Sequence, residues 1–331
     1  MNMLTAKQTQ LFLLVLILGF LAGPRVIEAL QRFGSDAHTL ATVGTSGEKS
    51  DLASGVESVE KENPYKKISL SAKSAYVWDV SEHEKLFELN GGLRLPLASV
   101  TKIMTAHVAT ESLPIGTEII ITPMDILADG DTGLAVGEQW TLEKLLQFTL
   151  VASSNDGASA LARTAGARLP GGTTTDPILN KKLFVEQMND RVRLIGLTGT
   201  FFRNESGLDV SPSESGAHGT ARDMAMLFDY VFRKHPGIFT GTPYAKLDIR
   251  SESGILHHVN NTNQDVSGIA GIIGSKTGYT DLAGGNLVIV VDIGVDHPIV
   301  IAVLGSTQEK RFSDVKQLIA ATTEFIINDV P

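Results

Sequence analysis

The chain has 331 residues, of which 43% are hydrophobic and 20% charged, and its formal net charge is −9. This length allows two domains, or one large domain behind an accessory segment. The negative charge argues against a protein that tracks nucleic-acid phosphates, which needs a basic surface. Because the chain has no cysteine, disulfides, a cysteine nucleophile and cysteine-ligated zinc are excluded.

An apolar run without charges covers residues 11–23. These thirteen residues suit the core of a signal peptide and are fewer than the roughly 20 that span a bilayer comfortably. Cleavage after Gly23 is disfavoured by bulky Leu21 before it and Pro24 after it. We therefore expect residues 1–33 to form a cytoplasmic tip and a membrane anchor, with a cleaved signal peptide as the alternative. Both interpretations send the rest of the chain across the membrane.

Residues 34–64 contain no Phe, Trp or Tyr and are rich in Ser, Gly, Thr, Ala, Glu and Lys. Such a segment cannot bury enough apolar surface to offset its chain entropy. We therefore expect a flexible tether over this range. Residues 65–331 are expected to form one folded unit that carries the motifs described below.

Apolar periodicity divides the folded unit into strands, then helices, then strands again. The predicted elements are strands at residues 68–80 and 85–89, helices at 97–111, 141–150, 181–194 and 220–231, strands at 268–275, 285–293 and 298–305, and a helix at 310–327. Thr141 and Thr220 are expected to cap two helices, with Asp223 forming a near capping box. This order predicts an α+β fold, in which both ends of the unit build an antiparallel sheet flanked by helices, with a helical subdomain inserted between them.

Three short motifs follow one another along the folded unit. They are Ser99-Val100-Thr101-Lys102, Ser153-Ser154-Asn155 and Lys276-Thr277-Gly278. Ser-x-x-Lys, Ser-x-Asn and Lys-Thr-Gly in this order are typical of penicillin-binding proteins and class A β-lactamases. The set supplies an active-site serine, two candidate proton carriers and a cationic anchor for a substrate carboxylate.

Ser-x-x-Lys carries little information by itself. Copies begin at Ser46, Ser58, Ser99 and Ser313. Two copies lie in the expected tether and one in the final helix, whereas Ser99 opens a predicted helix after a Gly-Gly turn. Lys102 then lies one turn along the same face. The Ser99 hydroxyl is expected at the positive end of the helix dipole, near backbone N–H groups that can bind an oxyanion.

The protonation state of Lys102 decides how Ser99 is activated. Lys102 can act as a general base if desolvation lowers its pKa, because only the neutral amine accepts a proton. In the alternative, Lys102 stays charged and another group takes the proton. The sequence leaves both mechanisms open.

Ser153 and Asn155 lie between two apolar helical segments. This position predicts a loop that joins two helices and points its polar side chains into a cleft. Ser153 can relay a proton towards a leaving amine, and the Asn155 amide can bind a peptide backbone. The alternative is an ordinary turn with a helix cap.

Lys276, Thr277 and Gly278 follow an apolar, glycine-rich predicted strand. Lys276 would supply positive charge, Thr277 a hydroxyl for a carboxylate, and Gly278 clearance for a substrate that pairs along the strand edge. The alternative is an exposed strand end with a solvated lysine.

The segments around these motifs carry a family resemblance. They are ASVTKIMTA (98–106), VASSNDGASALA (151–162), FVEQMN (184–189), GLTGTFFRNESGL (196–208), HGTARDMA (218–225), NNTN (260–263) and GSKTGYTDLAGGNL (274–287). Over residues 68–327 the chain resembles the serine-type D-alanyl-D-alanine carboxypeptidases, the low-molecular-weight penicillin-binding proteins. The resemblance implies a serine β-lactamase/DD-peptidase-like fold for the catalytic domain at residues 65–331.

The resemblance also implies a role for each motif residue. Ser99 would be the acylated nucleophile, Lys102 its general base and Ser153 the proton relay. Substrate would be bound by Asn155, Lys276, Thr277, Gly278 and Tyr279. The backbone N–H groups of Ser99 and Tyr279 would form the oxyanion hole.

The predicted function is therefore removal of the terminal D-alanine from peptidoglycan stem pentapeptides outside the cytoplasmic membrane, without a metal or organic cofactor. β-Lactam antibiotics would bind covalently as inhibitors. The paired His257 and His258 have no third ligand at a recognisable metal spacing, so they predict no metal site. The alternatives are a DD-endopeptidase that cuts cross-links, a class A-like β-lactamase, and an inactive wall-binding module.

Overall fold

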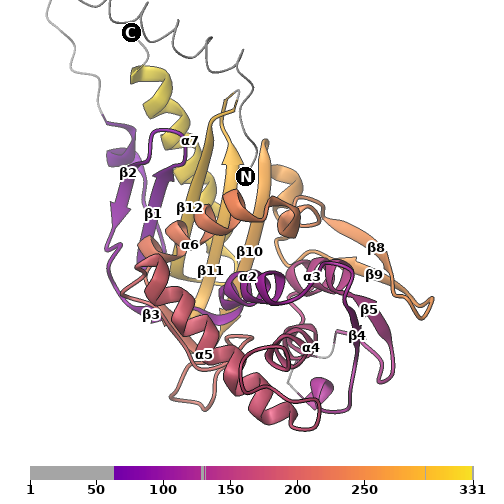
Figure 1. Cartoon of the computed structure of the whole chain (residues 1–331). Coiled ribbons are helices and arrows are strands. Elements are labelled where there is room, and N and C mark those ends of the chain that lie inside the picture. Colours follow the sequence, from indigo (N-terminus) through magenta and orange to yellow (C-terminus); the bar gives the residue numbers. More distant parts are fainter. Residues whose placement is uncertain (1–62, 128–129, 131, 295, 330–331) are drawn as a thin grey trace, which may run out of the picture. The chain divides into compact units, whose positions relative to one another are not determined.

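The computed structural model describes residues 63–127, 130, 132–294 and 296–329 (Figure 1). The predicted anchor and nearly all of the predicted tether lie outside these ranges. The described part begins with a 3₁₀ turn, Pro64–Lys67, in which Asn63 accepts a hydrogen bond from the backbone N–H of Tyr65. Within these ranges, no helix has the length and apolar character needed to cross a membrane.

Both ends of the folded unit contribute strands to one antiparallel sheet, as predicted. Its five strands run in the order β10-β11-β12-β1-β2. They are β1 (Ser74–Asp79), β2 (Glu84–Leu89), β10 (Ile272–Thr280), β11 (Gly284–Asp292) and β12 (Pro298–Ser306). Neighbouring strands are antiparallel throughout. The sheet therefore places β10, with the Lys-Thr-Gly motif, at one edge.

The central strands β11 and β12 are buried on both faces, which explains their nearly continuous apolar sequences. Alternate side chains enter two separate cores. Val288, Val290, Val300 and Ala302 pack towards the inserted helices, and Leu287, Ile289, Ile299 and Ile301 pack on the opposite face. The second face is covered by α7 (Lys310–Asp329), through Val315 and Leu318 (Figure 1).

The inserted block consists mainly of helices. They are α2 (Lys102–Ser112), α3 (Leu142–Val151), α4 (Asn155–Gly166), α5 (Pro177–Ile195) and α6 (Ala221–Lys234). α2 packs against each of the other four. Its residues are buried without interruption from Lys102 to Ala109. Burial on all sides follows from the position of α2 at the centre of the block.

The predicted helix caps are present. The Thr141 side chain accepts from the backbone N–H of Lys144 at α3, and Thr220 accepts from that of Asp223 at α6. The Asp223 carboxylate instead accepts from the backbone N–H of Gly199 and the hydroxyl of Thr200. The capping box is therefore incomplete. Its first hydrogen bond, to the Thr220 side chain, forms, but the Asp223 carboxylate binds the preceding loop instead of the backbone N–H of Thr220.

Two predicted strands have different bounds in the structure. The strand expected at 68–80 begins only at Ser74. The strand expected at 268–275 is β10, which starts at Ile272 after a 3₁₀ turn at Val266–Gly268 and continues to Thr280. Backbone pairing with β11 carries β10 through the polar motif, where side-chain periodicity gives no signal.

Three small sheets were not predicted. They are β3 (Leu95–Pro96), β7 (Ala217–Gly219) and β6 (Phe201–Phe202); β4 (Glu118–Ile120) with β5 (Gln139–Thr141); and β8 (Lys246–Arg250) with β9 (Leu256–Asn260). Most of these strands have three residues or fewer. Such short strands show too few alternations to be recognised in a sequence.

Candidate active site

The Ser-x-x-Lys motif forms the entry to α2. Ser99 lies in a 3₁₀ turn, Ala98–Thr101, which continues directly into the helix at Lys102. The Lys102 amine nitrogen donates to Ser99 Oγ at 2.8 Å. The two functional groups therefore meet as the i, i+3 spacing predicts.

Lys102 is fully buried and surrounded by acceptors. Besides Ser99, its nitrogen donates to Asn155 Oδ1 at 2.7 Å and to the Ser206 carbonyl oxygen at 3.0 Å. Burial lowers the pKa of Lys102 to about 7, although the negative charges of Glu205 and Asp156 act in the opposite direction. Near neutral pH a substantial fraction of the amine is therefore unprotonated and able to accept a proton.

The loop that supports Lys102 packs directly under the Ser99 turn. Gly207 has a φ of +79°, and a Cβ atom there would lie 1.9 Å from the Ala98 carbonyl oxygen. Asn204 accepts from the backbone N–H of Gly207 and donates to the Leu208 carbonyl oxygen. This bonding fixes the adjacent Ser206 carbonyl that receives Lys102.

The Ser-x-Asn motif is the junction between α3 and α4. Ser153 adopts a left-handed backbone with a φ of +60°. Ser154 then caps α4, because its side chain accepts from the backbone N–H of Gly157 at 2.9 Å. Asn155 is the first residue of α4 and accepts from Lys102. The predicted loop is thus a sharp turn whose two outer residues contact the two lysines of the site.

Lys276 lies on β10 and is also buried. Its nitrogen donates to Ser153 Oγ at 2.8 Å and to the Thr277 carbonyl oxygen at 2.9 Å. Burial lowers the pKa of Lys276 well below its usual value, and the positive charges of Lys102 and Arg311 lower it further. An anionic group bound here would relieve this unfavourable electrostatic environment.

The rest of the Lys-Thr-Gly segment faces both the site and the Ser99 turn. The Thr277 hydroxyl donates to Thr262 Oγ1 at 2.6 Å. A Cβ atom on Gly278 would lie 2.7 Å from the Leu97 carbonyl oxygen and 3.1 Å from the Val100 nitrogen. Only glycine fits between β10 and this turn. Tyr279, the next residue, has a side chain that is 45% exposed.

Two further residues, which belong to none of the three motifs, hold these parts together. Asn286 on β11 donates to the carbonyl oxygens of Pro96 and Leu97, and accepts from the backbone N–H of Gly305. Arg311 on α7 donates to the Gly278 carbonyl oxygen at 2.8 Å. The sequence did contain a signal for Asn286, because a single asparagine inside an otherwise apolar strand indicates a buried amide that needs hydrogen-bond partners. Arg311 had none, because helix periodicity does not report what a side chain contacts.

A cavity of about 510 Å³ lies against α5 and β6, and none of the motif residues of the candidate site line it. Its lining includes Glu205, the residue next to the Ser206 carbonyl that binds Lys102. It also includes Glu186. Class A β-lactamases use a glutamate placed after the Ser-x-Asn segment to activate the hydrolytic water, and Glu186 is the nearest candidate for that role in this sequence. The Glu186 side chain is 57% exposed and lies 4.0 Å from Lys182 on the same helix. It therefore occupies the solvent side of α5, whose opposite side buries Phe184 and Met188.

A family profile and individual related proteins both point to the D-alanyl-D-alanine peptidases. The profile of peptidase family S11, described as D-alanyl-D-alanine carboxypeptidase, matches residues 58–308. The D-alanyl-D-alanine carboxypeptidase DacF of Bacillus subtilis is 28% identical over 260 residues, which cover 76% of this chain and 62% of that protein. A D-alanyl-D-alanine endopeptidase of Pseudomonas aeruginosa is 29% identical over 230 residues, 66% of each chain. The match with DacF thus spans less than two thirds of the length of that relative.

The fold also resembles solved structures. Penicillin-binding protein D2 of Listeria monocytogenes, in its ampicillin-bound form, is 26% identical with a TM-score of 0.64. The superposition covers 77% of this chain and 98% of that one. The α+β architecture predicted from the sequence is therefore confirmed as a penicillin-binding-protein fold.

Proposed function

The chain belongs to peptidase family S11, the D-alanyl-D-alanine carboxypeptidases, and from this premise we propose that it removes the terminal D-alanine from peptidoglycan stem pentapeptides. The observation that carries the proposal is the contact of 2.8 Å between the buried Lys102 amine and Ser99 Oγ. A serine beside a lysine whose pKa is lowered by burial is an activated nucleophile.

In the acylation step, Ser99 Oγ attacks the carbonyl carbon of the penultimate D-alanine. Lys102, with its pKa lowered to about 7, accepts the hydroxyl proton. The developing oxyanion would be bound by the backbone N–H groups of Ser99 and Tyr279. Asn286 and Arg311 position the two segments that carry these groups, because they bind the carbonyls of Leu97 and Gly278.

Collapse of the tetrahedral intermediate breaks the peptide bond and releases D-alanine. The proton that Lys102 took from Ser99 would reach the leaving amine through Ser153, which gives up its own hydroxyl proton and receives that one in exchange, so that Lys102 is neutral again. Lys276 donates to Ser153 Oγ at 2.8 Å, which orients this hydroxyl while Lys276 keeps its proton. The carboxylate of the terminal D-alanine would bind near Lys276 and Thr277, because a buried ammonium group is stabilised by an anionic partner. Lys102 would then accept a proton from the water that attacks the acyl-enzyme, and this proton passes to Ser99 Oγ as the ester bond breaks.

The relationship to an endopeptidase favours a second candidate function. The same catalytic groups would then cut the D-alanyl cross-link between two stem peptides. The two reactions differ only in whether the leaving amine belongs to free D-alanine or to a second peptide.

Mass spectrometry of purified muropeptides after incubation with the protein tests both functions. Loss of one alanine from pentapeptide is expected for the carboxypeptidase, and conversion of cross-linked dimers to monomers for the endopeptidase. Ser99→Ala should abolish either reaction. Ser313→Ala is the matched control, since the Ser313 hydroxyl donates to a carbonyl of its own helix. Turnover that survives Ser99→Ala would contradict the proposal.

We also propose that residues 11–23 tether the enzyme to the cytoplasmic membrane, with the catalytic domain outside. Full-length protein should then sediment with membranes. A truncated chain should remain soluble and active on soluble pentapeptide, provided that it retains Asn63, which caps the first turn, and the buried Pro64. Native protein that is soluble and processed at its N-terminus would indicate a cleaved signal peptide instead.

A further inference from the structure

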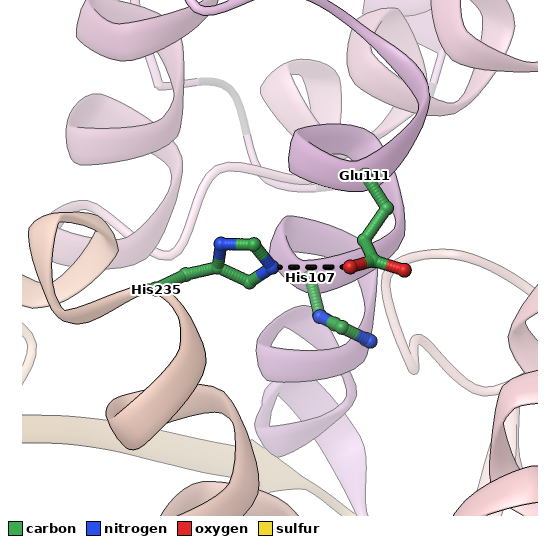
Figure 2. Close-up of side chains that lie close together, drawn as sticks. All are labelled: His107, Glu111 and His235. Carbon is green, nitrogen blue, oxygen red and sulfur yellow. Dashed lines mark hydrogen bonds and ion pairs between the residues drawn. The ribbon is translucent and has the colours of Figure 1, made fainter. Parts of the chain in front are cut away.

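Three side chains with metal-binding atoms gather outside the active site. His107 and Glu111 are four residues apart on α2, so they share one helix face. His235 is the C-cap residue of α6. One potential ligand atom from each residue lies within 4.8 Å of the others. Figure 2 shows the two imidazole rings and the carboxylate gathered between the two chain segments.

The His107 ring packs edge-on against Tyr230, but its two nitrogen atoms are not used in this contact. Its side chain is fully buried, and neither ring nitrogen has a hydrogen-bond partner among the residues that the structure describes. A buried polar atom without a partner is costly, so each such case requires an explanation. A metal ion bound by a ring nitrogen would supply the missing partner.

The Glu111 carboxylate is oriented towards the histidines. Arg191 contacts its Oε2 atom at 3.1 Å. The other oxygen, Oε1, lies 3.3 Å from His235 Nε2 (Figure 2). Ligands of a tetrahedral ion with bonds of about 2.0–2.1 Å are separated by about 3.3 Å. The distance between His235 Nε2 and Glu111 Oε1 therefore equals the separation of two ligands on such an ion, and the contact with Arg191 fixes the other carboxylate oxygen.

One cation competes for the same oxygen. Lys234 forms an ion pair with Glu111 Oε1, and its side chain is 42% exposed. An exposed lysine can move into solvent at little cost, because surface ion pairs contribute little to stability. The His235 side chain is 21% exposed, so the cluster is reachable from solvent on this side.

We propose that His107, Glu111 and His235 form a binding site for a divalent transition-metal ion, with Zn²⁺ the best match to two imidazoles and one carboxylate. The ion would link the last turns of α2 to the end of α6. His107 lies five residues beyond Lys102, about 7.5 Å along the helix axis. The site would therefore brace the helix that begins with the catalytic lysine, without touching the reacting groups.

The test is a calorimetric titration of the full-length protein in detergent with Zn²⁺, after treatment with a chelator. One Zn²⁺ per chain and a higher melting temperature are expected. His107→Leu should reduce the affinity at least about 100-fold, since even outer-shell changes cost 10- to 100-fold. Covalent labelling of this variant by fluorescent penicillin shows that it is folded.

Two further variants separate a metal site from a simple ion-pair cluster. Lys234→Ala should tighten Zn²⁺ binding, because it removes the competing cation. His297→Asn, which alters the separate pair between His297 and Asp79, should leave binding unchanged. The proposal fails if wild-type protein binds no Zn²⁺, if His107→Leu binds it equally well, or if only Lys234→Ala binds it.

Discussion

Gly278 on β10 approaches Leu97 so closely that a Cβ atom on the glycine would lie 2.7 Å from the leucine carbonyl oxygen. This contact sets the spacing between the two chain segments whose N–H groups we propose as the oxyanion hole. Asn286 donates to the same carbonyl at 3.0 Å, and Arg311 donates to the carbonyl of Gly278 itself. The position of Ser99, the proposed nucleophile, therefore depends on β10, β11 and α7, although Ser99 itself lies in the turn that leads into α2.

Gly278→Ala should slow acylation by penicillin about 100-fold. The added methyl group must push β10 away from the Ser99 turn, and a displacement of reacting groups by about 1 Å lowers a reaction rate by about that factor. The rate of labelling by fluorescent penicillin measures the effect. Gly92→Ala is the matched control, since a Cβ atom there meets nothing within 4 Å. Acylation of Gly278→Ala at the wild-type rate would show that the close contact is not needed.

Acylation should depend on the protonation state of Lys102. Its pKa is lowered to about 7, so the rate constant for acylation should rise as the pH increases through about 7 and then level off. Glu205 favours the charged amine through its own negative charge. Glu205→Gln should therefore move the midpoint of the profile to lower pH.

Glu186→Gln is the control for this shift, because it removes the same type of charge from the exposed face of α5. Its midpoint should match that of the wild type. A pH profile that does not respond to Glu205→Gln would indicate that Lys102 is not the group that titrates.

Asn286→Ala should lower the free energy of unfolding by about 1–3 kcal/mol, since it removes three hydrogen bonds in a buried region, although the Leu97 carbonyl oxygen keeps a second partner in the Val100 N–H. Urea unfolding followed by circular dichroism measures this change. Asn260→Ala, at an exposed position, should have little effect. Equal losses in the two variants would argue against a specific role for Asn286.

Penicillin should remain on Ser99 as a long-lived adduct. The bulky penicilloyl group is expected to block the approach of water, and Glu186 contacts Lys182 on the outer face of α5. Intact-mass measurement after stopped incubations should show the adduct persisting for minutes or longer, with or without Glu186→Gln. Rapid turnover of penicillin that Glu186→Gln abolishes would instead identify a β-lactamase.

The sequence alone determined the parts of this protein in which the information is local. The motifs at Ser99, Ser153 and Lys276 identified side chains that meet in the candidate site, and apolar periodicity located most of the main helices. The caps at Thr141 and Thr220 form as predicted, because a helix cap involves residues only three apart. Long apolar runs likewise identified β11 and β12, since strands buried on both faces need no polar alternation.

Only the tertiary structure decided the properties that depend on distant residues. The pKa of Lys102 falls because surrounding helices and the Ser206 loop exclude water from it, which no spacing of residues in a sequence expresses. His235 is likewise distant in sequence from His107 and Glu111, and only the fold brings it to the helix face that carries them. Burial and electrostatic environment are set by what packs around a side chain, so they appear only when the chain has folded.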